Sequence, residues 1–439
     1  MALSAGRFFA WPNEICSVCL PYSAVPVVTL YRPQATDQGA DVSHPESLKP
    51  PSPLPDSDIR HWMLSDELIF LNHGSFGARP RPIYAMQDDL RRSNESRPIE
   101  ALVDQMIDVL PVVKRSIGQF IGADPDGIGM VQNASEAINS VVRSIEFAPG
   151  DEIVTTTHGY NAVLQLLRYV SNRSGAVLHE IPVPIPVRDA GESIAAVLDA
   201  ISDRTRLVLI DHVTSPTALH VDVAGVIEHC RARGIDVLVD GAHAPGMLEL
   251  DVTTLAPTWY VGNLHKWVCA PIGAAFLWTE EACRDRVHPA IISHGYTDGY
   301  AAEFDWQGTR DMSAWRLVPD VIDWMERQWG WASIRAHNHA LATWAHAHLV
   351  ESWNSDPLTP LSGELLGSMA AIRLPEGPFE QRFGDPLELQ RHLRHDFGIE
   401  VPIMDWGGRW LLRVSAQIYN RPDDYLALDR AVKSITASL

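Results

Sequence analysis

Two ionisable side chains stand where the sequence predicts the ends of buried strands. Lys266 follows the apolar segment 258–262 (TWYVG) and precedes another one, 273–278 (GAAFLW). Asp240 closes the apolar segment 236–240 (DVLVD). Burying an unpaired ammonium costs several kcal/mol or lowers its pKa. A lysine at such a position therefore indicates that its amine is used.

A third group at a predicted strand end is suited to anions. In the loop 132–139 (QNASEAIN), Asn133, Ala134 and Ser135 stand at a predicted helix N-terminus, where backbone N–H groups and the helix dipole favour a phosphate. An amine for a Schiff base, an acid for a ring nitrogen and a phosphate anchor are what pyridoxal phosphate requires. Taken singly, Asp240 could instead be a helix cap or an ion-pair member, and Ser135 an N-cap.

The segments around these residues predict an α/β fold. Short apolar segments alternate with amphipathic ones, and we expect strands at 151–156, 176–183, 206–213 and 236–240, with helices at 162–174, 192–201 and 226–234. This alternation is typical of a largely parallel sheet covered by helices on both faces. Ligands then bind at the carboxyl ends of the strands.

The chain divides into three predicted parts. Residues 1–55 lack periodicity and end in a proline-rich linker, so we interpret them as an extension that is mostly disordered, or else as a misassigned start. Residues 56–315 form a large α/β domain. Residues 316–439 begin with helix-rich sequence and continue as α+β, which predicts a smaller C-terminal domain.

Composition excludes several classes of protein. The formal net charge of −20 argues against a nucleic-acid-binding surface. No apolar run reaches the roughly 18–20 residues that span a bilayer. The leader is a poor signal peptide, and five cysteines do not form a disulfide framework, so we expect a soluble, cytoplasmic protein. Cys16 and Cys19 form a lone CxxC, for which a zinc site is not expected.

Four histidines gather in one predicted helix, at positions 337, 339, 346 and 348. Residues two apart point to different helix faces, whereas helical zinc sites use a spacing of four. We therefore predict a solvated helix and no metal.

Eight motifs in order identify a family resemblance. They are FLNHGSFGARPRP (70–82), QNASEAIN (132–139), HGYNAV (158–163), IDHVTSPTAL (210–219), VDGAHAPG (239–246), GNLHKW (262–267), WQGTRD (306–311) and LLRVSAQIYN (411–420). From about residue 60 to its end the sequence resembles the class V aminotransferase group of fold-type I pyridoxal-phosphate enzymes, in its isopenicillin N epimerase-like branch. The resemblance implies a mostly parallel sheet of the seven-stranded type in the large domain.

The resemblance implies cofactor roles for the matching residues. Lys266 forms the Schiff base with pyridoxal 5′-phosphate and moves the Cα proton, while Asp240 keeps the ring nitrogen protonated. Tyr160 covers one face of the ring, and His243 lies near its phenolic oxygen. The other residues implied to bind the cofactor are Asn133, Ala134, Ser135, Ser215, Asn263, His265 and Thr309.

The resemblance also implies a homodimer, in which Thr309 reaches the site of the neighbouring subunit. Arg413 holds the substrate carboxylate, a task that suits its planar pair of donors. Asn72 and His73 line the substrate side. On the residues alone, Tyr160 could be a core aromatic and Arg413 a structural ion-pair member.

The fate of the proton at Cα decides the reaction. Return on the opposite face gives epimerisation, return to the cofactor gives transamination, and loss of a β-substituent gives elimination. We expect an amino-acid epimerase or racemase, with His73 or water as the second acid. A C–S lyase or an aminotransferase of the same family is the alternative. The connection 288–306 is shorter than in antibiotic-pathway epimerases, which leaves the substrate open.

Two further classes are less expected. A persulfide-forming desulfurase needs a cysteine shortly before Arg413, yet no cysteine follows Cys283. A non-catalytic regulator would carry a DNA-binding module, and the leader is too poor in Lys and Arg to be one.

Overall fold

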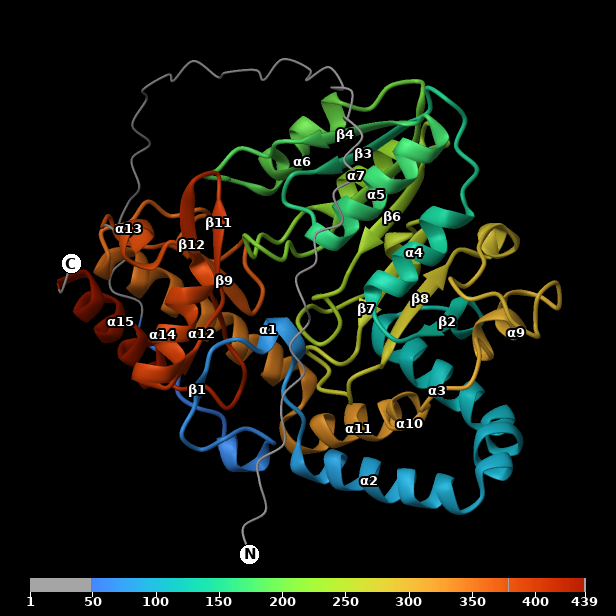
Figure 1. Ribbon diagram of the computed structural model, residues 1–439, viewed down its shortest axis with the longest axis horizontal. Helices are drawn as coiled ribbons and strands as arrows, with labels where there is room; N and C mark the ends of the chain where they lie inside the picture. Colours follow the sequence, from blue (N-terminus) through green and yellow to red (C-terminus); the bar gives the residue numbers. More distant parts are fainter. Residues whose placement is uncertain (1–48, 378, 438–439) are drawn as a thin grey trace, which may run out of the picture. The chain divides into compact units, whose positions relative to one another are not determined.

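The computed structural model describes residues 49–377 and 379–437 (Figure 1). Residues 1–48 of the predicted extension, with Cys16 and Cys19, lie outside the described residues. Within the described part of the chain, no helix is long and apolar enough to cross a membrane.

The large sheet has seven strands in the order β2-β8-β7-β6-β5-β3-β4. Strands β3 to β7 run parallel, while β8 is antiparallel to both β2 and β7. The prediction of a mostly parallel sheet is thus confirmed. The strands are β2 (Ile128–Val131), β3 (Glu152–Thr156), β4 (Val177–Ile181), β5 (Thr205–Asp211), β6 (Asp236–Asp240), β7 (Trp259–Asn263) and β8 (Ala275–Thr279).

Helices cover both faces of this sheet because its central strands are apolar on both sides. In β5, Leu207 and Leu209 share one core with α4 (Ala134–Ser144) and α5 (Asn161–Ser174). Val208 and Ile210 face the opposite core. That core contains α3 (Gln105–Ile121), α6 (Ala190–Asp199), α7 (Val223–Arg231) and α11 (Val318–Trp329). Strand side chains alternate between faces, so each β5 residue reaches only one of the two cores.

Among the described residues, nine further helical elements precede α11. They are η1 (Ile59–His61), α1 (His73–Phe76), α2 (Arg81–Ser96), η2 (Glu100–Asp104), η3 (Pro125–Gly127), α8 (Val252–Leu255), η4 (Glu281–Arg286), α9 (Tyr300–Asp305) and α10 (Ser313–Arg316). Figure 1 shows α1 between the large sheet and the C-terminal sheet. A segment close to the N-terminus of the described chain therefore lies beside the ends of the central strands.

The C-terminal region is built on a three-stranded antiparallel sheet in the order β11-β12-β9. Its elements are α12 (Trp331–Ser352), β9 (Met369–Arg373), α13 (Phe379–Phe383), α14 (Pro386–Phe397), β10 (Ile399–Glu400), β11 (Ile403–Trp406), β12 (Arg409–Ser415) and α15 (Pro422–Ala437). β1 (Ile69–Phe70) pairs with β10. The segment that leads into α1 is therefore held by the C-terminal region.

Packing favours a later domain division than residue 316. Met325 and Ile334 belong to the core of the large sheet, whereas Leu341 and Leu349 belong to the C-terminal core. We therefore propose that the two domains divide within α12.

The histidine-rich helix α12 is not solvated, and that prediction is wrong. His346 is fully buried and His337 nearly so. The helix packs between β9 and α15, with Leu341 and Leu349 in the core, so His346 is enclosed by packed side chains. Burial lowers the pKa of His346 to about 4, which keeps the ring neutral. Among the described residues, no group of three or more His, Cys, Asp and Glu side chains could hold a metal ion.

Gly77 allows α1 to approach the turn that carries Lys266. Its φ is +72°, and a Cβ there would lie 2.3 Å from the His265 carbonyl oxygen and 2.7 Å from the Lys266 carbonyl oxygen. Gly150 has a φ of +89° but nothing within 4 Å of a Cβ. Both positions disfavour a side chain through backbone strain, and only Gly77 adds a clash with fixed backbone atoms.

We predict that Gly77→Ala lowers the free energy of unfolding by more than Gly150→Ala does. Strain alone costs about 1–3 kcal/mol, and the clash at Gly77 adds to it. Urea unfolding of both variants and the wild type measures the difference. Equal losses would mean that α1 does not rest on the Lys266 turn.

Candidate active site

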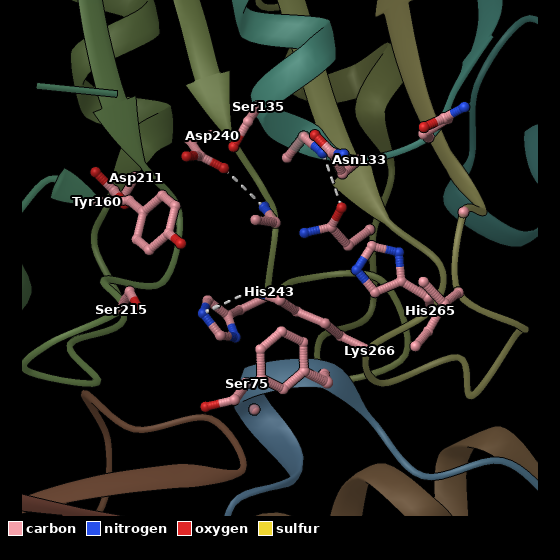
Figure 2. A pocket seen from close by; sticks show the side chains of 18 of the residues that line it. Ser75, Asn133, Ser135, Tyr160, Asp211, Ser215, Asp240, His243, His265 and Lys266 are labelled. Carbon is pink, nitrogen blue, oxygen red and sulfur yellow. Dashed lines mark hydrogen bonds between the residues drawn. The ribbon is translucent and has the colours of Figure 1, made fainter. Parts of the chain in front are cut away.

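A cavity of about 510 Å³ lies at the carboxyl ends of the central parallel strands (Figure 2). This volume is within the range of pockets that bind small molecules. Its walls come from the ends of β5, β6 and β7, the N-terminus of α4, the α1 segment and β12. The predicted site residues that line it are Asn133, Ala134, Ser135, Tyr160, Ser215, Asp240, His243, Asn263, His265, Lys266 and Arg413.

Lys266 enters the cavity from the turn that follows β7. The backbone N–H groups of Leu264 and His265 donate to the Ala274 carbonyl at 3.0 and 3.1 Å, which closes this turn against β8. Burial, and then the charge of Arg413, lower the pKa of Lys266 to about 8. Free amine is therefore present close to neutral pH. Both Schiff-base formation and proton abstraction require it.

Asp240 and Asp211 face the same cavity from adjacent strands. They are register partners in β6 and β5, and neighbouring strands lie about 4.8 Å apart. Their exposed fractions are only 3% and 4%. Burial raises the pKa of Asp240, and burial together with the charge of Asp240 raises the pKa of Asp211 well above its usual range. A cationic ligand group beside Asp240 would therefore stabilise the ionised carboxylate.

His243 is the immediate partner of the lysine amine. Its Nε2 lies 3.2 Å from Lys266 Nζ, and its Nδ1 accepts from the indole N–H of Trp267 at 3.4 Å. Burial lowers the pKa of His243 well below its usual range, so the ring is neutral. With Nδ1 as acceptor, the ring proton lies on Nε2 and can be donated to the neutral amine.

The α4 end of the cavity offers donors suited to an anion. Asn133 is the N-cap of α4, and its side chain accepts from Glu136 N–H. Asn133, and not Ser135, is therefore the cap. The N–H of Ala134 donates to Asn263 Oδ1 at 2.8 Å. This N–H is therefore already bonded to a second residue that was predicted to bind the phosphate. The N–H of Ser135 has no acceptor among the described residues.

His265 closes the same end of the cavity. Its Nδ1 lies 3.1 Å from the Ala274 carbonyl oxygen, so this nitrogen carries the proton and Nε2 is left as an acceptor. Burial lowers the pKa of His265 to about 4. A phosphate group there would favour a second proton on the ring, because the charged form would then have a counter-ion.

Arg413 reaches the cavity from β12 of the C-terminal sheet. One terminal nitrogen, Nη1, donates to the carbonyl and hydroxyl oxygens of Ser215 at 2.5 and 3.1 Å, and Nη2 donates to Ser75 Oγ at 3.2 Å. Its Nε is buried without a hydrogen-bond partner. No carboxylate of the described residues pairs with this guanidinium. Burial lowers its pKa to about 10, so it remains a cation that lacks an anion.

Three predicted residues do not line this cavity. Thr309 lies in a separate hollow beside Arg91 and Arg310. Asn72 is buried, and its side chain donates to Glu400 at 3.4 Å. His73 is also fully buried.

The position of His73 contradicts the expectation that it lines the substrate side. Its Nδ1 lies 2.8 Å from the Tyr419 hydroxyl, and its Nε2 lies 3.1 Å from the Lys266 carbonyl oxygen. Burial lowers the pKa of His73 to about 3. A neutral ring with both nitrogens engaged supports the Lys266 turn from behind and cannot deliver a proton to a ligand.

Sequence reasoning missed Asp211, Ser75 and Gln132, which also line the cavity. Asp211 closes the apolar strand RLVLID in the same way that Asp240 closes DVLVD. That shared pattern of an acid at a strand end was the available signal. Ser75 lies in the NHGSFG segment, next to the residues that were expected to face the substrate.

Comparison with known proteins agrees with this site. The sequence profile of the class V aminotransferase family matches residues 72–374. Isopenicillin N epimerase of Streptomyces clavuligerus is 31% identical over 390 residues, covering 85% of this chain and 96% of that protein. The probable chloroplastic L-cysteine desulfhydrase of Arabidopsis thaliana is 30% identical over 421 residues, covering 90% of this chain and 87% of that protein.

Solved structures share the fold. The apo cysteine desulfurase from Thermococcus onnurineus NA1 superposes with a TM-score of 0.74 at 19% identity, covering 89% of this chain and 100% of that one. A mutant of C-DES, with glycine covalently linked to its pyridoxal-phosphate cofactor, has a TM-score of 0.75 at 17% identity. The match covers 85% of this chain and 98% of that one. The fold is that of fold-type I pyridoxal-phosphate enzymes. The chain belongs to the class V aminotransferase family, whose cofactor is pyridoxal phosphate.

The described residues fit this cofactor. Lys266 offers an amine, and Asp240 has one carboxylate oxygen bonded to Ala242 N–H and a second one available to a ring nitrogen. The unpaired N–H of Ser135 suits a phosphate oxygen. Arg413 lines the same cavity and has no acidic partner among the described residues, so it is available to an additional ligand that carries an anionic group.

The raised pKa of Asp211 predicts a pH-dependent effect of Asp211→Asn on the apo-protein. The folded protein keeps this proton to a higher pH than the unfolded chain, so stability is lost as pH rises from the ordinary carboxyl range through the raised pKa. Asn has no proton to lose. Relative to wild type, Asp211→Asn should therefore gain stability on going from about pH 4 to about pH 8.

Urea unfolding of the apo-protein at both pH values measures this gain. Asp203→Asn, at an exposed position just before the same strand, is the control and should show no such pH dependence. A stability difference for Asp211→Asn that is equal at both pH values would contradict the assignment.

Proposed function

We propose that this pyridoxal-phosphate enzyme acts at Cα of an α-amino acid and that its reaction is epimerisation or racemisation. The observation that carries the substrate class is the buried guanidinium of Arg413, which has no acidic partner among the described residues and opens on the cavity that contains Lys266. A substrate α-carboxylate supplies the missing anion. The similarity to isopenicillin N epimerase over most of the chain supports the reaction.

Each site residue has a defined task in this proposal. When bound, pyridoxal phosphate supplies a ring that withdraws the electron pair left at Cα. Asp240 keeps the ring nitrogen protonated, and Tyr160 covers the ring. Arg413 orients the substrate through its carboxylate. Lys266, with a pKa lowered to about 8, accepts the Cα proton on its amine.

The proposed phosphate ligands are Ser135, Asn263 and His265. The N–H of Ser135 is unengaged, as described above, and the hydroxyl of the same residue adds a second donor. Asn263 orients the first turn of α4 through Ala134. His265 would become a donor once a phosphate raises its pKa. Ser215 positions Arg413 by accepting hydrogen bonds from its guanidinium, so it contributes to substrate binding in this proposal.

Elimination of a β-substituent is the second candidate reaction. Relatives named L-cysteine desulfhydrase share about 30% identity with this chain over most of its length, as the epimerases do. The same residues serve both reactions up to removal of the Cα proton. A persulfide-forming desulfurase is not proposed, because Cys230, Cys269 and Cys283 are buried and none of them lines the cavity. Burial also raises the pKa of Cys230 to about 11.

A cytoplasmic homodimer remains part of the proposal. Thr309 lies outside the cavity of its own chain, as a residue that serves a neighbouring subunit must. Ile99 and Ile107, in the helical segment near this hollow, have exposed fractions of 71% and 72%, which suits burial against a second copy. Light scattering of the purified protein measures the oligomeric state.

NMR with L-amino acids in deuterated water, without any keto-acid, tests the reaction. Deuterium at Cα together with the D-isomer supports epimerisation. Pyruvate and ammonia from a β-substituted amino acid would instead show elimination. Lys266→Ala should lower turnover by about 10³-fold and abolish the visible absorbance of the lysine-bound cofactor, whereas Lys433→Ala, on the exposed side of α15, should change neither. Unchanged turnover in Lys266→Ala would overturn the site.

Arg413→Lys tests the substrate class. A lysine retains the charge but not the bidentate geometry, so we expect kcat/KM to fall by roughly 10–100-fold, mostly through KM. Arg409→Lys, at the exposed start of the same strand, is the matched control. A fall confined to kcat would mean that Arg413 does not hold the substrate carboxylate.

A further inference from the structure

Inversion at Cα requires two proton carriers, one on each face of the carbon. Lys266 is the carrier on one face. The other carrier must lie in the cavity and hold a proton that it can give up. It must also approach from a different wall. This requirement rests on the proposed epimerisation.

Most titratable groups around the cavity do not meet these conditions. His73 is buried behind the Lys266 turn. His243 contacts the Lys266 amine and therefore approaches from the same side of the cavity as Lys266. His265 is bonded to the Ala274 carbonyl at the α4 end. Asp211 and Asp240 close their strands deep in the sheet, where Asp240 serves the ring nitrogen.

Tyr160 does meet them. It is the N-cap residue of α5, in the loop after β3, and its side chain is 48% exposed although it lines the cavity. Its hydroxyl has no hydrogen-bond partner among the described residues. Figure 2 shows the phenol entering the cavity on the side of Asp211 and Ser215, while Lys266 enters beside His243. A core aromatic would be buried, so the packing does not explain this position.

The surroundings of Tyr160 place it beside the substrate carboxylate. Its backbone N–H acts on the Asp211 carboxyl, whose pKa it lowers, so the start of α5 lies beside the end of β5. Its phenol is within electrostatic reach of Arg413, because an ionised Tyr160 would raise the pKa of that guanidinium. Arg413 in turn is bonded to Ser215. A carboxylate held by Arg413 would thus bring the attached Cα close to the phenol.

We infer that Tyr160 is the second catalytic proton carrier and that its hydroxyl exchanges a proton with Cα on the face opposite Lys266. In one direction the Lys266 amine takes the Cα proton, and Tyr160 O–H gives its proton to the other face. Lys266 is then an ammonium and Tyr160 a phenolate. Solvent then takes a proton from the Lys266 ammonium and returns one to the Tyr160 phenolate. The reverse direction exchanges the two roles.

Tyr160→Phe separates this role from covering the ring, because phenylalanine keeps the aromatic face and loses only the hydroxyl. In deuterated water, with the amino acid identified for the wild type, we expect inversion to fall by about 10²–10⁴-fold in both directions. The isomer whose Cα hydrogen faces Lys266 should still exchange it for deuterium with retention. The opposite isomer should not exchange.

Two controls accompany this variant. Tyr169→Phe removes a hydroxyl from a 49% exposed tyrosine on the same helix, outside the cavity, and should leave both exchanges unchanged. Visible absorbance and cofactor affinity of Tyr160→Phe should match those of the wild type. These two readouts report the ring environment and not turnover.

The outcomes are distinct. Inversion by Tyr160→Phe within about threefold of wild type would overturn the assignment, since loss of an acid–base group costs about 10²-fold or more. Equal loss of exchange from both isomers would also overturn it, because Tyr160 would then support the whole site. Absence of inversion in the wild type would instead refute the proposed epimerisation, a result that is read before any variant is made.

Discussion

Four ionisable side chains, all buried or half-buried, face one cavity in this protein, and the fold gives none of them an oppositely charged partner. Asp211 and Asp240 stand on one side, Lys266 and Arg413 on others, and none of the four forms an ion pair with another described residue. Charges in such a setting are usually paired, because burial without a partner raises the free energy of the folded state. In the proposed function the partners come from ligands, a cationic ring nitrogen for Asp240 and a carboxylate for Arg413. The cost of burying these groups without partners is offset when ligands of opposite charge bind beside them.

The placement of these four groups depends on rigid elements from three parts of the chain. The carboxyl groups are fixed by the register of β5 and β6, since a shift of either strand by one residue would turn its own carboxyl group into the opposite core. Arg413 is supplied by the C-terminal sheet, whose neighbour β10 also pairs with β1. Behind the Lys266 turn, His73 bonds to the Lys266 carbonyl and to Tyr419, and so links α1 to the C-terminal region. Movement of one region therefore changes the position of the amine relative to the guanidinium.

The sequence predicted the residues whose role follows from local pattern. Lys266 and Asp240 each close an apolar segment, and adjacent parallel strands necessarily bring such ends together. His73 and the histidines of α12 could not be placed in the same way. Their burial is decided by elements far away in the chain, Tyr419 for His73 and α15 for His346. Thr309 shows a different limit, because its expected site belongs to another copy of the chain. Asp211 carried the same pattern as Asp240 and was within reach of sequence reasoning.

The cavity also explains why the family relationship alone leaves the reaction open. In the proposed function, Asp240, Lys266 and the α4 end prepare the Cα proton for removal, and the same groups would serve an epimerase or a lyase. What distinguishes the two reactions is the group that meets the substrate on the wall away from Lys266. There the protein offers a hydroxyl at Tyr160 and the guanidinium of Arg413, and no cysteine lines the described cavity. If Tyr160 is the proton donor that we infer, this wall favours return of a proton to Cα. Elimination would further require a group that stabilises a departing β-substituent. The choice between the reactions thus rests on a few atoms of the β3–α5 loop, while the sheet and its strand ends are common to both.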